Sequence, residues 1–119
     1  MKKILCIDDS NTSLLLLGYT LINAGYKPIP VTKVEHAIQI IKNETPDMIL
    51  LDLSMPEISG YDFLKMRSDL QIENVPIIVI SAFDSKESIQ STIELGANDF
   101  ITKPIKIEFV LQKIKQYLA

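Results

Sequence analysis

The chain begins with a short apolar run that ends in two acids, Ile4-Leu5-Cys6-Ile7-Asp8-Asp9. Two similar apolar runs follow later, Met48-Ile49-Leu50-Leu51 and Ile77-Ile78-Val79-Ile80. A strand whose neighbouring residues are all apolar has to be covered on both faces, which is typical of parallel sheets with helices on either side. These runs therefore predict the central strands of a parallel sheet.

Two weaker segments predict the remaining strands. Pro28-Ile29-Pro30-Val31 contains two prolines, which cannot donate ladder hydrogen bonds, so we expect this strand at an edge. Asp99-Phe100-Ile101 follows Gly96, a residue typical of a helix end. Strands and helical segments thus alternate along the chain, which predicts an α/β fold. We expect a doubly wound three-layer sandwich with right-handed crossovers and a five-stranded parallel sheet in the flavodoxin-like order 2-1-3-4-5.

Each segment between the strands has an apolar face with helical spacing. Such faces are formed by Leu14, Leu17, Leu21 and Ile22 in the first segment and by Ile107, Val110, Leu111, Ile114 and Leu118 in the last. The run Leu14-Leu15-Leu16-Leu17 predicts a buried helix rather than a groove for a partner. Thr32 with Glu35 three residues on has the spacing of a capping box and predicts the start of the second helix.

Length and composition exclude several classes of protein. The 119 residues fit one domain, residues 1–119, and the net charge of −3 argues against direct binding of nucleic acid. Cys6 and His36 are the only residues of their types, which excludes an internal disulfide and a zinc site. We expect Cys6 to be a buried, inert thiol. The first apolar run is too short for a signal peptide, and no run could span a membrane, so we expect a cytoplasmic protein without membrane insertion.

Polar residues follow the predicted strands at the edge of the sheet where ligands bind in open α/β folds. They are Asp8 and Asp9 after the first strand, Asp52 after the third, Ser81 after the fourth and Lys103 after the fifth. In the order 2-1-3-4-5 the first and third strands are neighbours, which brings the three carboxylates together. Such a cluster needs a cation, and its hard oxygen ligands favour Mg²⁺.

The same residues indicate phosphoryl transfer to a carboxylate. Lys103 and Ser81 suit phosphoryl oxygens, and an Asp beside a metal and a lysine can attack phosphorus to form an aspartyl phosphate. Each residue also has a plainer explanation. Asp9 or Ser10 could cap the next helix, Asp52 could start a turn, and Ser81 or Lys103 alone indicates little. The interpretation as a site of phosphoryl transfer therefore rests on the placement of all these residues together.

Together these residues resemble a known family, the receiver domains of two-component response regulators, of the type found in chemotaxis regulators. The resemblance rests on Asp8-Asp9, on Asp52 with Met55-Pro56 and Gly60, on Ser81-Ala82, and on Gly96-Ala97 followed by Phe100 and Lys103-Pro104. These motifs span essentially the whole chain. Each alone is unspecific, but their order and spacing together are highly specific.

The resemblance implies a role for each of these residues. Asp52 would accept the phosphoryl group, and Ser81 and Lys103 would hold it. Asp9, Asp52 and the backbone carbonyl of Ser54 would bind Mg²⁺, with Asp8 helping through water. Ser81 and Phe100 would form the switch, although Phe100 lacks the hydroxyl group of a tyrosine. The peptide bond between Lys103 and Pro104 would be cis. Neither Ser54 nor Phe83 could orient a hydrolytic water, which predicts slow self-dephosphorylation.

The resemblance also implies a function, a phosphorylation-dependent switch in a two-component phosphorelay. The donor would be a histidine kinase or a histidine phosphotransfer protein, and the target a downstream protein or a fused output domain. Such a chain turns over no external substrate. One alternative is a receiver-like binding module that acts without phosphorylation, against which the intact acidic cluster argues. Another is a phosphohydrolase with an aspartate nucleophile, but Ser54 stands where that class has a second carboxylate. Flavin binding is disfavoured because Asp8 and Asp9 would repel the flavin phosphate.

Overall fold

The computed structural model describes residues 1–53, 59–82 and 85–118. Its strands are β1 (Lys3–Ile7), β2 (Lys27–Val31), β3 (Met48–Leu51), β4 (Ile77–Ser81) and β5 (Asp99–Thr102). Its helices are α1 (Asn11–Asn23), α2 (Val34–Asn43), α3 (Gly60–Lys65), α4 (Lys86–Glu94) and α5 (Ile107–Tyr117). Strands and helices alternate without exception along the described chain, as the sequence predicts.

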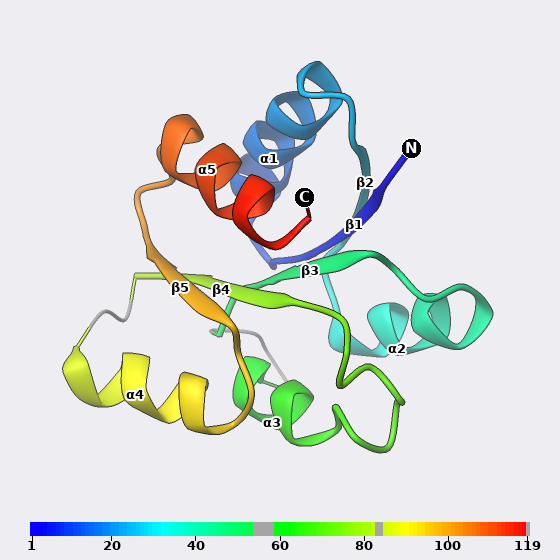
Figure 1. The fold of residues 1–119 in the computed structure, drawn as a ribbon, viewed down its shortest axis with the longest axis vertical. Helices are drawn as coiled ribbons and strands as arrows, with labels where there is room; N and C mark the ends of the chain where they lie inside the picture. The colour runs from blue at the N-terminus through cyan, green and yellow to red at the C-terminus, as the bar shows by residue number, and fades with distance from the viewer. Residues whose placement is uncertain (54–58, 83–84, 119) are drawn as a thin grey trace.

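The strands form one parallel sheet in the order β2-β1-β3-β4-β5. This confirms the predicted fold class and strand order. The strand with Pro28 and Pro30 lies at the edge, where a missing backbone donor costs no ladder bond. Figure 1 shows α1 and α5 on one side of the sheet and α2, α3 and α4 on the other.

The two helical layers explain the apolar runs of the central strands. In β1, Leu5 and Ile7 belong to the core cluster on the side of α2 and α3, whereas Ile4 and Cys6 belong to the cluster beneath α1 and α5. Because successive side chains of a strand point to opposite faces, a strand with two covered faces must be apolar throughout. The prediction that Cys6 is buried is confirmed.

Four predictions about the helices are wrong. The helix α2 begins at Val34, and its N-cap is Lys33 without a side-chain cap, because Thr32 lies one residue too early to cap it. In α1 the buried face consists of Leu14, Leu17, Thr20 and Leu21. Ile22 and Leu15 are exposed instead, so the leucine run is not a fully buried helix. Ile107 at the start of α5 is also exposed.

The helix α5 is tied to the beginning of β5 by polar contacts. Lys113 Nζ lies 2.9 Å from Asp99 Oδ2, and the hydroxyl group of Tyr117 donates to the same oxygen at 3.0 Å. That hydroxyl group also donates to the carbonyl of Asn98. Among the described residues, no helix is both long and apolar enough to cross a membrane.

Candidate functional site

The predicted site residues lie at the carboxyl ends of four strands. Asp8 follows β1, Asp52 follows β3, Ser81 ends β4 and Lys103 follows β5. Backbone hydrogen bonds extend past the strand ends and hold three of these residues. The Asp8 amide donates to Val31, the Asp52 amide to Ile7 and the Lys103 amide to Ser81. The rigid end of the sheet therefore sets the positions of the functional side chains.

The three predicted acids converge as expected. Carboxylate oxygens of Asp8, Asp9 and Asp52 all lie within 4.8 Å of one another. Asp8 and Asp52 are buried, at 2% and 5% exposure, whereas Asp9 is exposed at the rim. A cluster of this kind is costly unless a positive charge offsets the repulsion between its members.

Lys103 reaches the cluster from the carboxyl end of the edge strand β5. Its Nζ donates to Asp8 Oδ2 at 3.0 Å and lies 4.0 Å from Asp52 Oδ2. One ammonium group cannot balance three carboxylates, so this group of described side chains keeps a formal charge of minus two. A divalent cation would neutralise that charge, and oxygen-only ligands suit Mg²⁺. The donor set therefore fits a magnesium ion.

The turn after β1 orients the Asp8 carboxylate, a contribution that the sequence analysis missed. The backbone N–H of Ser10 donates to Asp8 Oδ1 at 2.9 Å. The Ser10 hydroxyl group in turn accepts from the Ser13 amide and caps α1. An acid whose side chain accepts from the amide two residues on forms an Asx turn, so this spacing was the available signal. Both oxygens of Asp8 thus have a hydrogen-bond donor.

Gly60 allows α3 to begin directly against the end of β3. A Cβ atom at this position would lie 2.5 Å from the Asp52 carbonyl oxygen and 2.7 Å from Leu53 Cα. The Gly60 amide donates to the Leu53 carbonyl at 3.1 Å. Ser59 caps α3 through a reciprocal capping box with Asp62. The motif predicted from the sequence includes Gly60, but the steric requirement depends on how closely the backbone of Asp52 and Leu53 approaches it.

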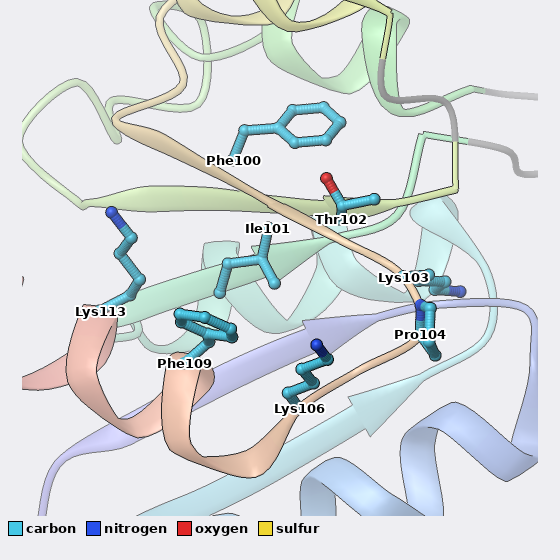
Figure 2. Close-up of a pocket in the computed structure, with 8 residues that line it drawn as sticks. All are labelled: Phe100, Ile101, Thr102, Lys103, Pro104, Lys106, Phe109 and Lys113. Atoms are coloured by element: carbon cyan, nitrogen blue, oxygen red, sulfur yellow. The ribbon is translucent and has the colours of Figure 1, made fainter.

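The two predicted switch residues lie on the neighbouring strands β4 and β5 and are not part of the acidic cluster. Ser81 is buried, and its backbone carbonyl accepts from the Lys103 amide. Phe100 is half-buried on β5 and packs against the core cluster on the side of α2, α3 and α4. Figure 2 shows Phe100 and Phe109 on opposite sides of β5, with Lys103 and Pro104 at the end of the strand. Ser54 and Phe83 lie outside the described residues.

Two further predictions from the sequence are confirmed, one at the end of β5 and one inside β1. The peptide bond between Lys103 and Pro104 is cis, as the resemblance implies. Burial, and secondarily the charge of Asp8, raises the pKa of the Cys6 thiol to about 12. Cys6 is therefore protonated at neutral pH and unsuited to bind a metal or act as a nucleophile.

The chain is similar in sequence to known proteins of one family. The family model of the response regulator receiver domain matches residues 4–115. Sporulation initiation phosphotransferase F of Bacillus subtilis is 32% identical over 98% of this chain and 94% of its own length. The alkaline phosphatase synthesis transcriptional regulatory protein PhoP of Bacillus subtilis is 33% identical over 98% of this chain, which spans 48% of that protein.

A solved structure shows the same fold. The chemotaxis protein CheY4 of Vibrio cholerae superposes with a TM-score of 0.92 at 28% identity, over 98% of both chains. The family match, over residues 4–115, includes residues of all five strands. The chain belongs to the response regulator receiver domain family.

Proposed function

We propose that this chain is a phosphorylation-dependent switch in which Asp52 accepts a phosphoryl group from a phosphohistidine donor in a reaction that requires Mg²⁺. The observation that carries this proposal is the convergence of Asp8, Asp9 and Asp52 within 4.8 Å, with the Lys103 ammonium group beside them. Receiver domains are signalling modules rather than enzymes that turn over a substrate. The name of one relative, a phosphotransferase, also supports phosphoryl transfer.

The surroundings of the three acids support Asp52 as the acceptor. Both oxygens of Asp8 accept hydrogen bonds, from Ser10 and Lys103. Asp9 lies exposed at the rim. Asp52 is buried at the end of a central strand, with Lys103 Nζ 4.0 Å from its Oδ2. An oxygen of Asp52 would attack the phosphorus atom as the bond from phosphorus to the imidazole nitrogen breaks, and the released imidazole would keep that electron pair and take up a proton.

The other site residues would offset charge during the transfer. Asp8, Asp9, Asp52 and the backbone carbonyl of Ser54 would hold Mg²⁺, which when bound neutralises charge on the carboxylates and the phosphoryl oxygens. Lys103, which bonds Asp8 and lies 4.0 Å from Asp52, would pair with a phosphoryl oxygen, and the Ser81 hydroxyl group would donate to another. Because Ser81 and Phe100 lie on adjacent strands, a shift of Ser81 toward the phosphoryl group would change the packing of Phe100 and hence partner binding.

Receiver domains interact with histidine kinases and with downstream targets. For this chain we propose a histidine kinase or a histidine phosphotransfer protein as the donor, and a downstream protein or a fused output domain as the target. We further propose that residues 1–119 act as one domain in the cytoplasm. The net charge of −3 supports a protein partner over direct contact with nucleic acid.

A phosphate-affinity gel tests the assignment of Asp52. The chain is incubated with acetyl phosphate, or with phosphoramidate as a donor that contains a phosphorus–nitrogen bond, with and without Mg²⁺. We expect a retarded band for the wild type only with Mg²⁺, no retarded band for Asp52→Asn, and wild-type behaviour for Asp69→Asn, which changes an exposed acid on the surface. Equal retardation of the wild type and Asp52→Asn would contradict the proposal.

A further inference from the structure

The two edge strands of the sheet differ in their ability to accept another strand. In β2 the amides of Lys27 and Asp8 mark the side that faces β1, because Lys27 donates to Lys2 and Asp8 donates to Val31. The alternate residues Pro28 and Pro30 therefore face the outer edge, and neither has a backbone donor. At the opposite edge, β5 contains no proline and pairs with β4 alone among the described strands. The edge of β5 is thus the open one.

The backbone of β5 presents specific groups at this edge. The N–H and C=O groups of one residue in a parallel strand point to the same side, and those of the next residue point to the other side. The Lys103 amide donates to the Ser81 carbonyl of β4 at 2.9 Å, so Phe100 and Thr102 face outward. Asp99 Oδ1 accepts from the Phe100 amide at 2.8 Å and covers that donor. The N–H group of the exposed Thr102 is left to pair with an added strand.

A hollow of about 400 Å³ lies beside the open edge. Figure 2 shows Phe100 on one side of β5, and Phe109 and Lys106 on the other side. Apolar side chains make up much of the lining, including those of Ile101 and Pro104. A volume of this size is within the range of ligand pockets. The edge of β5 therefore combines backbone groups that can pair with a hollow that can accept side chains.

Every charged residue that lines the hollow is a lysine. Lys103 and Lys113 already pair with acids of the chain. Lys106 Nζ instead lies 5.8 Å from the centre of the Phe109 ring and, among the described residues, forms no ion pair with an acid. An ammonium group beside an aromatic ring at the rim of an apolar hollow is complementary to a carboxylate. The charge of the hollow thus favours an acidic occupant.

An extended segment at this edge would present its side chains alternately to two different surroundings. Successive side chains of a strand point to opposite faces of the sheet. On one face of β5 lie Lys106 and Phe109, and on the other face lies Phe100. A segment that alternates acidic and apolar residues would direct its acids toward Lys106 and its apolar residues toward Phe100.

We propose that an extended acidic segment of a partner protein adds as a sixth strand to the outer edge of β5, where it accepts a hydrogen bond from the Thr102 amide and pairs with Lys106. Addition of a strand to an open sheet edge is an established way to bind a peptide. A second copy of this chain fits less well, because pairing β5 with β5 would bring two lysine-lined hollows together. The proposal does not depend on the transfer of a phosphoryl group to Asp52.

Nuclear magnetic resonance of the ¹⁵N-labelled full chain, without a phosphoryl donor, tests the proposal. The probe is an acetylated and amidated heptapeptide of alternating Glu and Val. At a peptide concentration about ten times the dissociation constant, we expect hydrogen exchange of the Thr102 amide to slow about tenfold, because the bound peptide covers this group. A heptapeptide of alternating Lys and Val should bind at least about tenfold more weakly.

Two N-methylated probes distinguish strand addition from binding through side chains alone. One carries N-methyl groups on all its Glu residues and the other on all its Val residues. In an added strand only one of these two sets of backbone groups faces β5. We therefore expect one probe to bind like the parent peptide and the other to lose binding.

Charge reversal at Lys106 tests the contribution of the hollow. Lys106→Glu should raise the dissociation constant of the Glu–Val peptide about tenfold or more and improve binding of the Lys–Val peptide. Lys115→Glu is the matched control, since Lys115 is an exposed lysine of α5 that, among the described residues, does not line the hollow. It should bind the Glu–Val peptide as the wild type does. Both variants should keep the wild-type melting temperature.

Four outcomes would overturn the proposal. The first is a Glu–Val peptide that does not bind at millimolar concentration. The second is an equal effect of Lys106→Glu and Lys115→Glu on its binding. The third is equal binding of the two N-methylated probes. The fourth is slow exchange of the Thr102 amide in the concentrated chain without peptide and fast exchange on dilution, which would assign the edge to a second copy.

Discussion

At the scale of single residues, two helical glycines have opposite surroundings. A Cβ atom at Gly60 would collide with the backbone of Asp52 and Leu53, whereas one at Gly18 would meet nothing within 4 Å. Sequence alone does not distinguish these positions, because both are glycines within helices. The difference depends on how closely another backbone approaches, which only the tertiary structure defines.

We predict that Gly60→Ala destabilises the fold by about 1–3 kcal/mol, because α3 or the end of β3 has to move to admit the methyl group. The same movement displaces Asp52, so phosphorylation by acetyl phosphate should also slow. Urea unfolding and the phosphate-affinity gel measure these two effects. Gly18→Ala is the control, and it should stabilise the fold by roughly 0.5–1 kcal/mol. Equal effects of the two variants would contradict the steric argument.

Lys103 gives a second prediction at this scale. Its ammonium group bonds buried Asp8 and lies near buried Asp52, so Lys103→Met leaves two buried carboxylates without that cation. The side chain of Lys103 is 21% exposed, so solvent screens part of its interaction with the two acids. We therefore expect the variant to lose about 1–3 kcal/mol of unfolding free energy, measured by urea unfolding without divalent cations. Lys106 is an exposed lysine that lines the same surface hollow as Lys103. Lys106→Met should therefore leave the free energy of unfolding nearly unchanged. A similar small change in both variants would count against a role for Lys103 in holding the cluster together.

At the scale of the elements, the strands were more predictable than the helix surfaces. The tetrads of β1, β3 and β4 are apolar because both of their faces are covered, and the two prolines of β2 locate the edge. The exposure of Ile22 and Leu15 was not predictable in this way. Hydrophobic spacing defines a face, but it does not show whether another element of the same chain covers that face.

The contact between β5 and α5 gives a prediction about pH. Burial acts to raise the pKa of Asp99, but hydrogen bonds from Lys113, the Phe100 amide and Tyr117 hold it below its usual value. The carboxyl pKa is therefore lower in the folded than in the unfolded chain. It follows that this group stabilises the fold above the unfolded value of about 3.9 and that the contribution is lost as pH falls through the lowered folded value.

We expect Asp99→Asn to lower the free energy of unfolding at pH 7 by roughly 0.5–1 kcal/mol, since Lys113 is about a third exposed. The variant should also lose less stability than the wild type on acidification below about pH 4. Urea unfolding at a series of pH values measures both effects, with Asp69→Asn as the control. An identical pH dependence of the wild type and Asp99→Asn would show that the pKa of Asp99 is not lowered by folding.

At the scale of the whole molecule, the sheet order determines the site. Asp8 and Asp52 are 44 residues apart in the sequence, and they meet because β1 and β3 are neighbours in the sheet. Lys103 reaches them from the end of β5. The strand order predicted from the sequence was therefore sufficient to bring these residues together. The Ser10 amide and the close approach at Gly60 were not predictable to the same extent, because they depend on local backbone geometry.

Magnesium should stabilise the whole fold through this site. A ligand that binds only the folded state adds about 2.7 kcal/mol when its concentration is a hundred times its dissociation constant. We expect the melting temperature of the wild type to rise when Mg²⁺ is added. It should fall back to its metal-free value when a chelator removes the metal. Asp9→Asn removes one of the three carboxylates and should weaken this response, whereas Asp69→Asn should retain it. Equal responses of the wild type and Asp9→Asn would place the metal elsewhere.

The buried sulfur atom in the central strand provides a way to follow opening of the fold. Cys6 is 1% exposed and has a pKa of about 12, and the chain contains no tryptophan. An alkylating reagent such as iodoacetamide requires an accessible thiolate, so it should modify Cys6 only when β1 separates from its neighbours. The labelling rate, read by mass spectrometry, would then report the unfolding equilibrium under native conditions with no added chromophore.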